Sequence, residues 1–117
     1  VMRTTGLHPG EDTVRMLWNL HVAAVACDNP AVEVWPPGFL LEEGERAAAM
    51  ADPHRVHESF VHTVLLPMLG LPLGEMFFLD DLAADCAADG RYDFLFTSAP
   101  INLPAGVASP PNALAIK

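Results

Sequence analysis

Residues 62–75 read HTVLLPMLGLPLGE and join the end of a predicted helix to the start of a predicted strand. Upstream of them, Asp52 can cap a helix that has Pro53 at its first position. An apolar stripe at i, i+4 spacing then predicts a single helix that runs into the quoted stretch. The members of this stripe are Val56, Phe60, Val64 and Met68. Gly70 is expected to end the helix, and residues 71–78, LPLGEMFF, are expected to form a short buried strand.

The rest of the chain continues this alternation of helix and strand. Residues 11–21 and 79–89 have apolar positions at helical spacing and acidic residues in the first turn, where the helix dipole favours them. Residues 22–30 are predicted to form a buried strand that leads into a loop at its end, residues 91–100 are a predicted strand, and ALAIK at the end of the sequence can form a last one. The alanine-rich residues 40–53 are expected to be a connecting segment that can be helical for a turn or two. The order helix, strand, helix, strand, helix, strand predicts an α/β fold.

The composition limits the classes of partner. Half of the 117 residues are hydrophobic (51%) and only 18% are charged, so part of the apolar surface is expected to meet another subunit or a segment outside this sequence. The net charge of −9, with no cluster of Lys or Arg, argues against binding to nucleic acid or to anionic lipid. No run reaches the roughly 18 apolar residues of a membrane span. We expect a cytoplasmic protein with a small-molecule substrate or a protein partner.

The two cysteines, Cys27 and Cys86, do not form a C-x-x-C pair. They are expected to be buried, reduced thiols of a cytosolic protein.

His62 and Glu75, at the two ends of the quoted stretch, are the candidate metal ligands. Glu75 lies in an otherwise apolar predicted strand, and a buried carboxylate needs a cation, a metal ion or access to solvent. Imidazole and carboxylate together suit zinc or manganese. Two ligands are too few for a tight site, so at least one more must come from elsewhere. The alternatives are that His62 simply hydrogen-bonds Glu75, or that Glu75 reaches water at the end of the strand.

Other candidate groups have ordinary structural explanations. His54 and His57 lie one helical turn apart and can pair on a metal ion, and Glu58 should face His62 at i, i+4 spacing. A polar helix face explains both patterns. The turn Asp28-Asn29-Pro30 closes a predicted strand where α/β proteins often place sites, but an Asx turn explains it equally well. Three more polar residues have no partner at a suitable spacing. These are His8, His21 and Ser109.

Two long stretches resemble a known family. VACDNPAVEV, residues 25–34, and the whole run of residues 62–117 are similar to the C-terminal half of the cyclase family, which includes the bacterial kynurenine formamidases (arylformamidases) and isatin-hydrolase-like enzymes. The resemblance implies a metal-dependent hydrolase with a swivelling β/β/α-type fold, usually oligomeric. In this family an N-terminal H-x-G-T-H-x-D-x-P-x-H motif supplies most metal ligands and the catalytic histidine. A later histidine and glutamate complete the site, and His62 and Glu75 match that later pair.

The sequence also departs from the family. The H-x-G-T-H motif is absent, and the gap from His62 to Glu75 is slightly longer than in the formamidases. Residues 1–117, which open in a predicted loop without an initiator methionine, are therefore expected to be the C-terminal part of a single hydrolase domain. Ala105 and Ala108 stand where glycines are expected, and alanine would strain the loop if either position needs a positive φ.

The resemblance therefore implies hydrolysis of an amide or a lactam, with an N-formylkynurenine-like molecule as one candidate substrate, by a homo-oligomer that carries zinc or manganese. No catalytic residue and no substrate-binding residue is assigned within the 117 residues, and the chain alone is expected to be inactive. The alternative is a non-catalytic, truncated α/β interaction module that binds a partner through its apolar surface.

Overall fold

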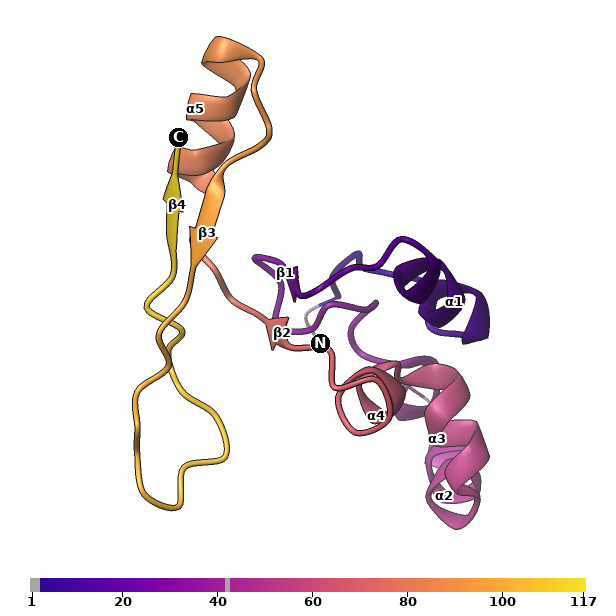
Figure 1. The fold of residues 1–117 in the computed structure, drawn as a ribbon. Coiled ribbons are helices and arrows are strands. Elements are labelled where there is room, and N and C mark those ends of the chain that lie inside the picture. Colours follow the sequence, from indigo (N-terminus) through magenta and orange to yellow (C-terminus); the bar gives the residue numbers. More distant parts are fainter. Residues whose placement is uncertain (1–2, 42) are drawn as a thin grey trace. The chain divides into compact units, whose positions relative to one another are not determined.

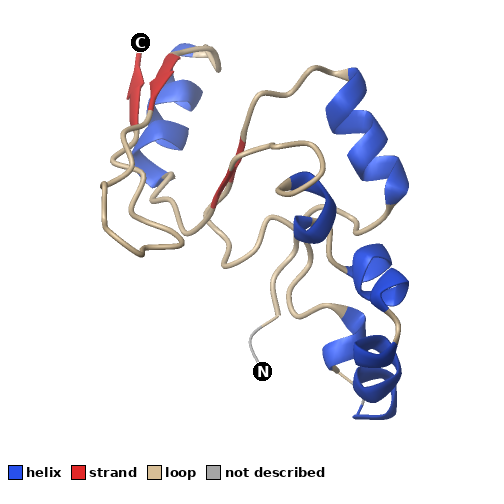
Figure 2. Cartoon of the chain, turned by 60° about the horizontal axis from the view of Figure 1, so that its bottom comes forward, coloured by secondary structure: helices blue, strands red, loops and turns tan. Residues whose placement is uncertain are grey.

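The computed structural model describes residues 3–41 and 43–117 of a mixed α/β chain (Figure 1). The chain divides into two compact units, of which the first ends at Phe77 and the second is Phe78–Lys117. Strands are short and much of the chain between the helices is loop (Figure 2). Within the described ranges, no helix combines the length and the apolarity that crossing a membrane requires. The predicted α/β class is confirmed, but the predicted strands are much longer than those observed.

The described part of the first unit contains helices and one pair of strands. Its elements are α1 (Glu11–Asn19), β1 (Val25–Ala26), the 3-10 helix η1 (Gly38–Leu40), α2 (Glu43–Ala51), α3 (Pro53–Ser59), α4 (His62–Leu65) and β2 (Leu73–Gly74). Strands β1 and β2 are parallel, with Val25 opposite Leu73 and Ala26 opposite Gly74. The crossover between them carries the helices from η1 to α4. Because parallel strands need such a crossover, this pairing brings the ends of two distant segments together.

The core of the first unit is a small cluster of buried apolar side chains. Its members are Leu17, Val32, Val61, Leu65 and Leu71. Leu17 comes from α1, whose acidic first turn and buried face agree with the predicted helix, although the helix ends at Asn19 and not at residue 21. Val61 and Leu65, both 0% exposed, anchor α4 in this core.

The predicted single helix from Asp52 to Gly70 is wrong in its middle. The helix start is correct, because the Asp52 carboxylate accepts a hydrogen bond from the His54 N–H (3.0 Å) and Pro53 is the first helical residue. At Phe60, however, the backbone is extended (φ −148°, ψ 93°), and this separates α3 from α4. His62 is therefore the first residue of a short helix and not a mid-helix residue.

Gly70 ends the turns that follow α4, as predicted. It has φ 63°, and its N–H donates to the Leu66 carbonyl (3.1 Å) while the Leu71 N–H donates to the Leu65 carbonyl (2.9 Å). The left-handed glycine and its bond to Leu66 form an αL C-cap motif. The motif turns the chain toward β2.

Residues 43–51 form a longer helix than expected. α2 has nine residues, whereas the alanine-rich segment predicts only a turn or two. Alanine has the highest helix propensity, and Ala49 is buried (1% exposed). An exposed ion pair links Glu45 of α2 to Arg55 of α3 (2.8 Å).

The second unit packs one helix with one antiparallel strand pair. Its elements are α5 (Asp80–Asp89), β3 (Leu95–Thr97) and β4 (Leu114–Ile116). Leu95 pairs with Ile116 and Thr97 with Leu114. Helix α5 ends as predicted at Gly90, which has φ 71° and donates its N–H to the Cys86 carbonyl (2.9 Å). The predicted final strand is confirmed, whereas the strand predicted over residues 91–100 is reduced to three residues.

Candidate metal centre

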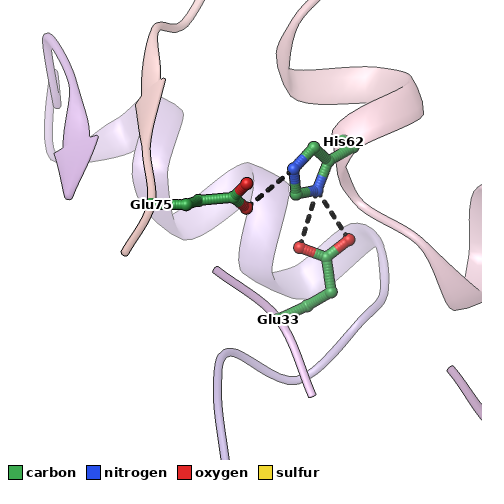
Figure 3. A group of neighbouring side chains, drawn as sticks. All are labelled: Glu33, His62 and Glu75. Carbon is green, nitrogen blue, oxygen red and sulfur yellow. Dashed lines mark hydrogen bonds and ion pairs between the residues drawn. The ribbon is translucent and has the colours of Figure 1, made fainter. Parts of the chain in front are cut away.

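Glu33, His62 and Glu75 meet in the first unit (Figure 3). The three come from separate segments: Glu33 from the extended segment after β1, His62 from the start of α4, and Glu75 from the residue after β2. The structure therefore brings together the two residues selected from the sequence and adds a third.

The imidazole ring of His62 lies between the two carboxylates. Its Nδ1 atom is 2.8 Å from both Glu33 oxygens, and its Nε2 atom is 2.9 Å from Glu75 Oε1. The same Oε1 atom accepts a hydrogen bond from the Val32 N–H (2.9 Å). All three side chains are thus held by polar contacts of hydrogen-bond length.

The three side chains differ in exposure. That of Glu33 is fully buried (0%), that of His62 is 17% exposed and that of Glu75 is 25% exposed. A buried carboxylate without a partner is costly, and the His62 ring supplies the partner of Glu33. The predicted need of Glu75 for a partner is met by His62 and the Val32 N–H together.

Glu33 was missed in the sequence, although a signal for it existed. It lies in the apolar run AVEVW, and the rule that singled out Glu75 in PLGEMFF applies equally to it.

The position of Glu33 is set by backbone pairing with the N-terminal segment: the Leu7 N–H donates to the Val32 carbonyl (2.9 Å) and the Val34 N–H to the Leu7 carbonyl (3.2 Å). Gly6 allows this close approach, because a Cβ atom there would lie 2.4 Å from the Glu33 carbonyl carbon.

Glu75 is placed by the end of the parallel strand pair. The Cys27 N–H donates to the Gly74 carbonyl (2.9 Å), and immediately after Glu75 the Met76 N–H donates to the Asn29 carbonyl (3.0 Å). Met76 has φ 56°, an uncommon value for a residue other than glycine. The Asn29 side chain also donates to the Thr5 carbonyl. The Asp28-Asn29-Pro30 turn thus supports the Glu75 loop, and the cluster itself contains none of its side chains.

The break between α3 and α4 places an aromatic side chain on the His62 ring. The rings of Phe60 and His62 are stacked, with centroids 4.6 Å apart and planes 5° apart. Trp35 packs at an angle against Phe60, with centroids 6.3 Å apart. Because the stack covers one ring face, it restricts the rotation of the imidazole.

The other predicted pairings are corrected or stay open. Glu58 does not face His62 as predicted, because the break at Phe60 puts the two residues on different helices; among the described residues the polar partners of the His62 ring are Glu33 and Glu75. Glu58 and His54 instead line a shallow pocket beside Glu11. The side chain of His57 lies outside the described part of the structure, so its predicted pairing with His54 stays a prediction.

Three isolated polar residues belong to ordinary local structure. The His8 carbonyl accepts from the Thr13 hydroxyl (2.6 Å), and His21 follows α1 with φ 53°. The Ser109 hydroxyl accepts from the Ile101 N–H and donates to the Pro110 carbonyl, both at 3.0 Å. This loop hydrogen bonding agrees with a turn and does not suggest a nucleophile.

Both cysteines are free thiols, as predicted, although only Cys86 is fully buried. The Cys27 thiol contacts the carbonyls of Asn29 (3.6 Å) and Ala31 (3.7 Å). Burial raises the pKa of Cys27, and the negative charges of Glu75 and Glu33 act in the same direction. The thiol therefore stays protonated beside the cluster.

The cluster has a donor set and a spacing that can hold a metal ion. One ligand atom from each of Glu33, His62 and Glu75 lies within 4.8 Å of the others. One nitrogen and carboxylate oxygens suit zinc or manganese. Ligands of a tetrahedral zinc ion lie about 3.4 Å apart, for metal–ligand bonds near 2.1 Å. The His62–Glu75 contact of 2.9 Å must therefore open by about half an ångström, and Nε2 must be unprotonated, for an ion to enter.

Fold and cluster together define a mixed α/β protein with a carboxylate–histidine site able to hold a metal ion. The chain matches the crystal structure of a protein described as a novel cyclase, with 36% identity and a TM-score of 0.70. The match covers 98% of this chain and 31% of that one, so these residues span about a third of its length. No family model and no curated protein sequence matches the chain. The chain is thus a relative of the cyclase family over this portion, and the resemblance seen in the sequence is confirmed.

Proposed function

We propose that the chain is part of a metal-dependent hydrolase of the cyclase/arylformamidase type, which cleaves an amide or a lactam. The observation that carries this proposal is the Glu33–His62–Glu75 cluster in a relative of the cyclase family. The two residues that resemble the family's later metal ligands, His62 and Glu75, are in contact at 2.9 Å although they lie on different elements.

His62 Nε2 and the Glu75 carboxylate would hold the ion. The Val32 N–H fixes one Glu75 oxygen, and the Phe60 ring restricts the imidazole plane, so both donors are held in place before any ion arrives. A bound divalent ion supplies Lewis-acid chemistry, which activates water and polarises a carbonyl. Two ligands do not complete a zinc or manganese site. We propose that the remaining ligands come from a part of the protein outside these 117 residues.

The same proposal covers the fold of the whole enzyme. We propose that residues 1–117 belong to a single hydrolase domain of the swivelling β/β/α type, that the enzyme is a homo-oligomer, and that its substrate is a small molecule such as an N-formylated arylamine. Two observations support a domain that extends beyond these residues. The strands are short, and the chain spans about a third of the length of the cyclase that it matches.

Metal analysis and hydrolysis assays test the proposal. Zinc and manganese binding is measured by calorimetry on the chain and on Glu75→Gln, with Glu58→Gln as a control that removes the same charge from an exposed position. We expect weak binding by the chain, loss of binding in Glu75→Gln and no change in Glu58→Gln. In the longer protein, Glu75→Gln should abolish N-formylkynurenine hydrolysis. Unchanged metal content and unchanged hydrolysis in Glu75→Gln would show that the site is wrongly assigned.

The exposed surface of the second unit favours a second candidate, a non-catalytic interaction module. Apolar side chains of both strands are exposed, among them Leu95 (63%), Phe96 (44%) and Leu114 (61%). Such a surface suits contact with protein. Stoichiometric, tight zinc binding by the 117-residue chain would argue against this candidate, whereas self-association without any metal binding would favour it.

A further inference from the structure

Glu33 and Glu75 contact different nitrogen atoms of the His62 ring (Figure 3). Both Glu33 oxygens are 2.8 Å from Nδ1, whereas Glu75 is 2.9 Å from Nε2. The two ring nitrogens are distinct, and the hydrogen bond made by one decides what the other can bind. An ion held by Nε2 would therefore use the ring nitrogen that Glu33 does not contact.

The two carboxylates also differ in their exposure to solvent. Glu33 is fully buried, while Glu75 is 25% exposed. An ion that arrives from solvent reaches Glu75 and Nε2, whereas Nδ1 is closed by Glu33 and the ring face is covered by Phe60. A carboxylate that accepts the second N–H of a ligating histidine fixes its tautomer and its orientation.

We propose that Glu33 is a positioning residue for His62 and not a metal ligand. Its carboxylate accepts the Nδ1 proton and holds the ring in the tautomer whose Nε2 atom is free to bind an ion beside Glu75. The consequence for metal affinity rests on the function proposed above, but the tautomer exists without any ion and can be observed separately.

The first test is the tautomer of His62 in the metal-free chain. Histidine-labelled protein is examined by ¹⁵N–¹H correlation NMR, His62→Gln assigns the signals, and the tautomer is determined for the neutral form of the ring. We expect the proton on Nδ1 and an unprotonated Nε2. A proton on Nε2 would overturn the proposal. Because this measurement uses the unaltered chain, it does not depend on whether any variant folds.

The second test is zinc affinity, measured by calorimetry on four proteins that are first compared by circular dichroism. Removal of an outer carboxylate typically weakens metal binding about 10- to 100-fold, so Glu33→Gln should lose about that factor. Glu75→Gln should lose more, and Glu58→Gln should bind like the unaltered chain. A loss in Glu33→Gln as large as that in Glu75→Gln would make Glu33 a ligand, and no loss would leave it without a role; either result overturns the proposal.

The two tests separate this inference from the proposed function. If the unaltered chain and Glu75→Gln bind zinc equally, the metal site of the proposed function fails. The NMR result then still decides whether Glu33 holds the Nδ1 proton.

Discussion

The Nδ1 atom of His62 lies 2.8 Å from both carboxylate oxygens of Glu33, a residue 29 positions earlier in the chain. Glu33 is fully buried, so its carboxylate depends on this ring for the polar contact that water would otherwise provide.

Replacing His62 by alanine should destabilise the first unit strongly. Removing the partner of a buried polar group costs about 1–3 kcal/mol, and more when the group is charged, whereas replacing both partners by apolar groups of the same shape can be nearly neutral. His62→Ala should therefore lower the free energy of unfolding by several times more than the double variant Glu33→Met/His62→Leu. Urea denaturation followed by circular dichroism measures both. Equal losses in the two proteins would show that the Glu33 carboxylate does not depend on the ring.

Gly6→Ala should disturb the cluster from a distance. The new Cβ atom would lie 2.4 Å from the Glu33 carbonyl carbon and 2.8 Å from the Val34 nitrogen, both backbone atoms that cannot easily move. Overpacking of this kind costs about 1–3 kcal/mol.

The matched control for Gly6→Ala is Gly44→Ala. Gly44 lies in α2, and a Cβ atom added there would meet no described neighbour within 4 Å. Alanine should therefore stabilise this helix by up to about 1 kcal/mol. Thermal unfolding compares the two variants, and a neutral Gly6→Ala would contradict the close approach.

Ala105→Gly should stabilise the loop of the second unit. Ala105 has φ 63°, which confirms that one of the two alanines expected to be glycine occupies the left-handed region. This conformation costs an L-residue about 1 kcal/mol, which glycine avoids. Ala108 is not among the described residues with positive φ, so Ala108→Gly should instead cost about 0.5 kcal/mol through chain entropy. Hydrogen exchange of amides in the second unit measures both, and the same sign of change in the two variants would contradict this prediction.

Lys117→Met should remove the loss of stability that α5 undergoes at acid pH. The Lys117 ammonium contacts Asp89 (2.7 Å) and Asp85 (2.9 Å), and its hydrogen bond to Asp89 holds the pKa of that carboxyl below 3.8. A lowered folded-state pKa means that the contact stabilises the fold above pH 3.8 and that this contribution is lost as the pH falls through the folded-state value. The bond to Asp89 also raises the pKa of Lys117, so the ammonium stays charged up to alkaline pH and its contribution is lost only above about 10.5.

Carboxyl NMR titration checks this prediction. The Asp89 pKa should rise toward its ordinary value in Lys117→Met. The backbone amides of α5 should also exchange with solvent faster at neutral pH. Glu11, whose exposed pairing with Arg15 is independent of Lys117, serves as an internal reference. An unchanged Asp89 titration would show that Lys117 does not hold this carboxyl.

Several elements of the fold could be predicted because their causes are local. Asp52 and Pro53 start α3, and the glycines at positions 70 and 90 end helical turns with the positive φ that glycine tolerates. Strand lengths could not be predicted in this way. A strand extends only as far as its partner runs beside it, and β1 and β2 pair over two residues each.

The candidate site was predicted in part, since Glu75 and His62 were selected and Glu33 was not. The sequence by itself determined that a carboxylate in an apolar run needs a partner, and that the nearest histidine could supply it. Only the tertiary structure decided that His62 serves two carboxylates, because the break at Phe60 turns the ring and the Leu7–Glu33 pairing brings the second carboxylate to it. Whether a charge is desolvated depends on segments that are distant in the chain, such as Val32 and Glu75, 43 positions apart. No local pattern contains that information.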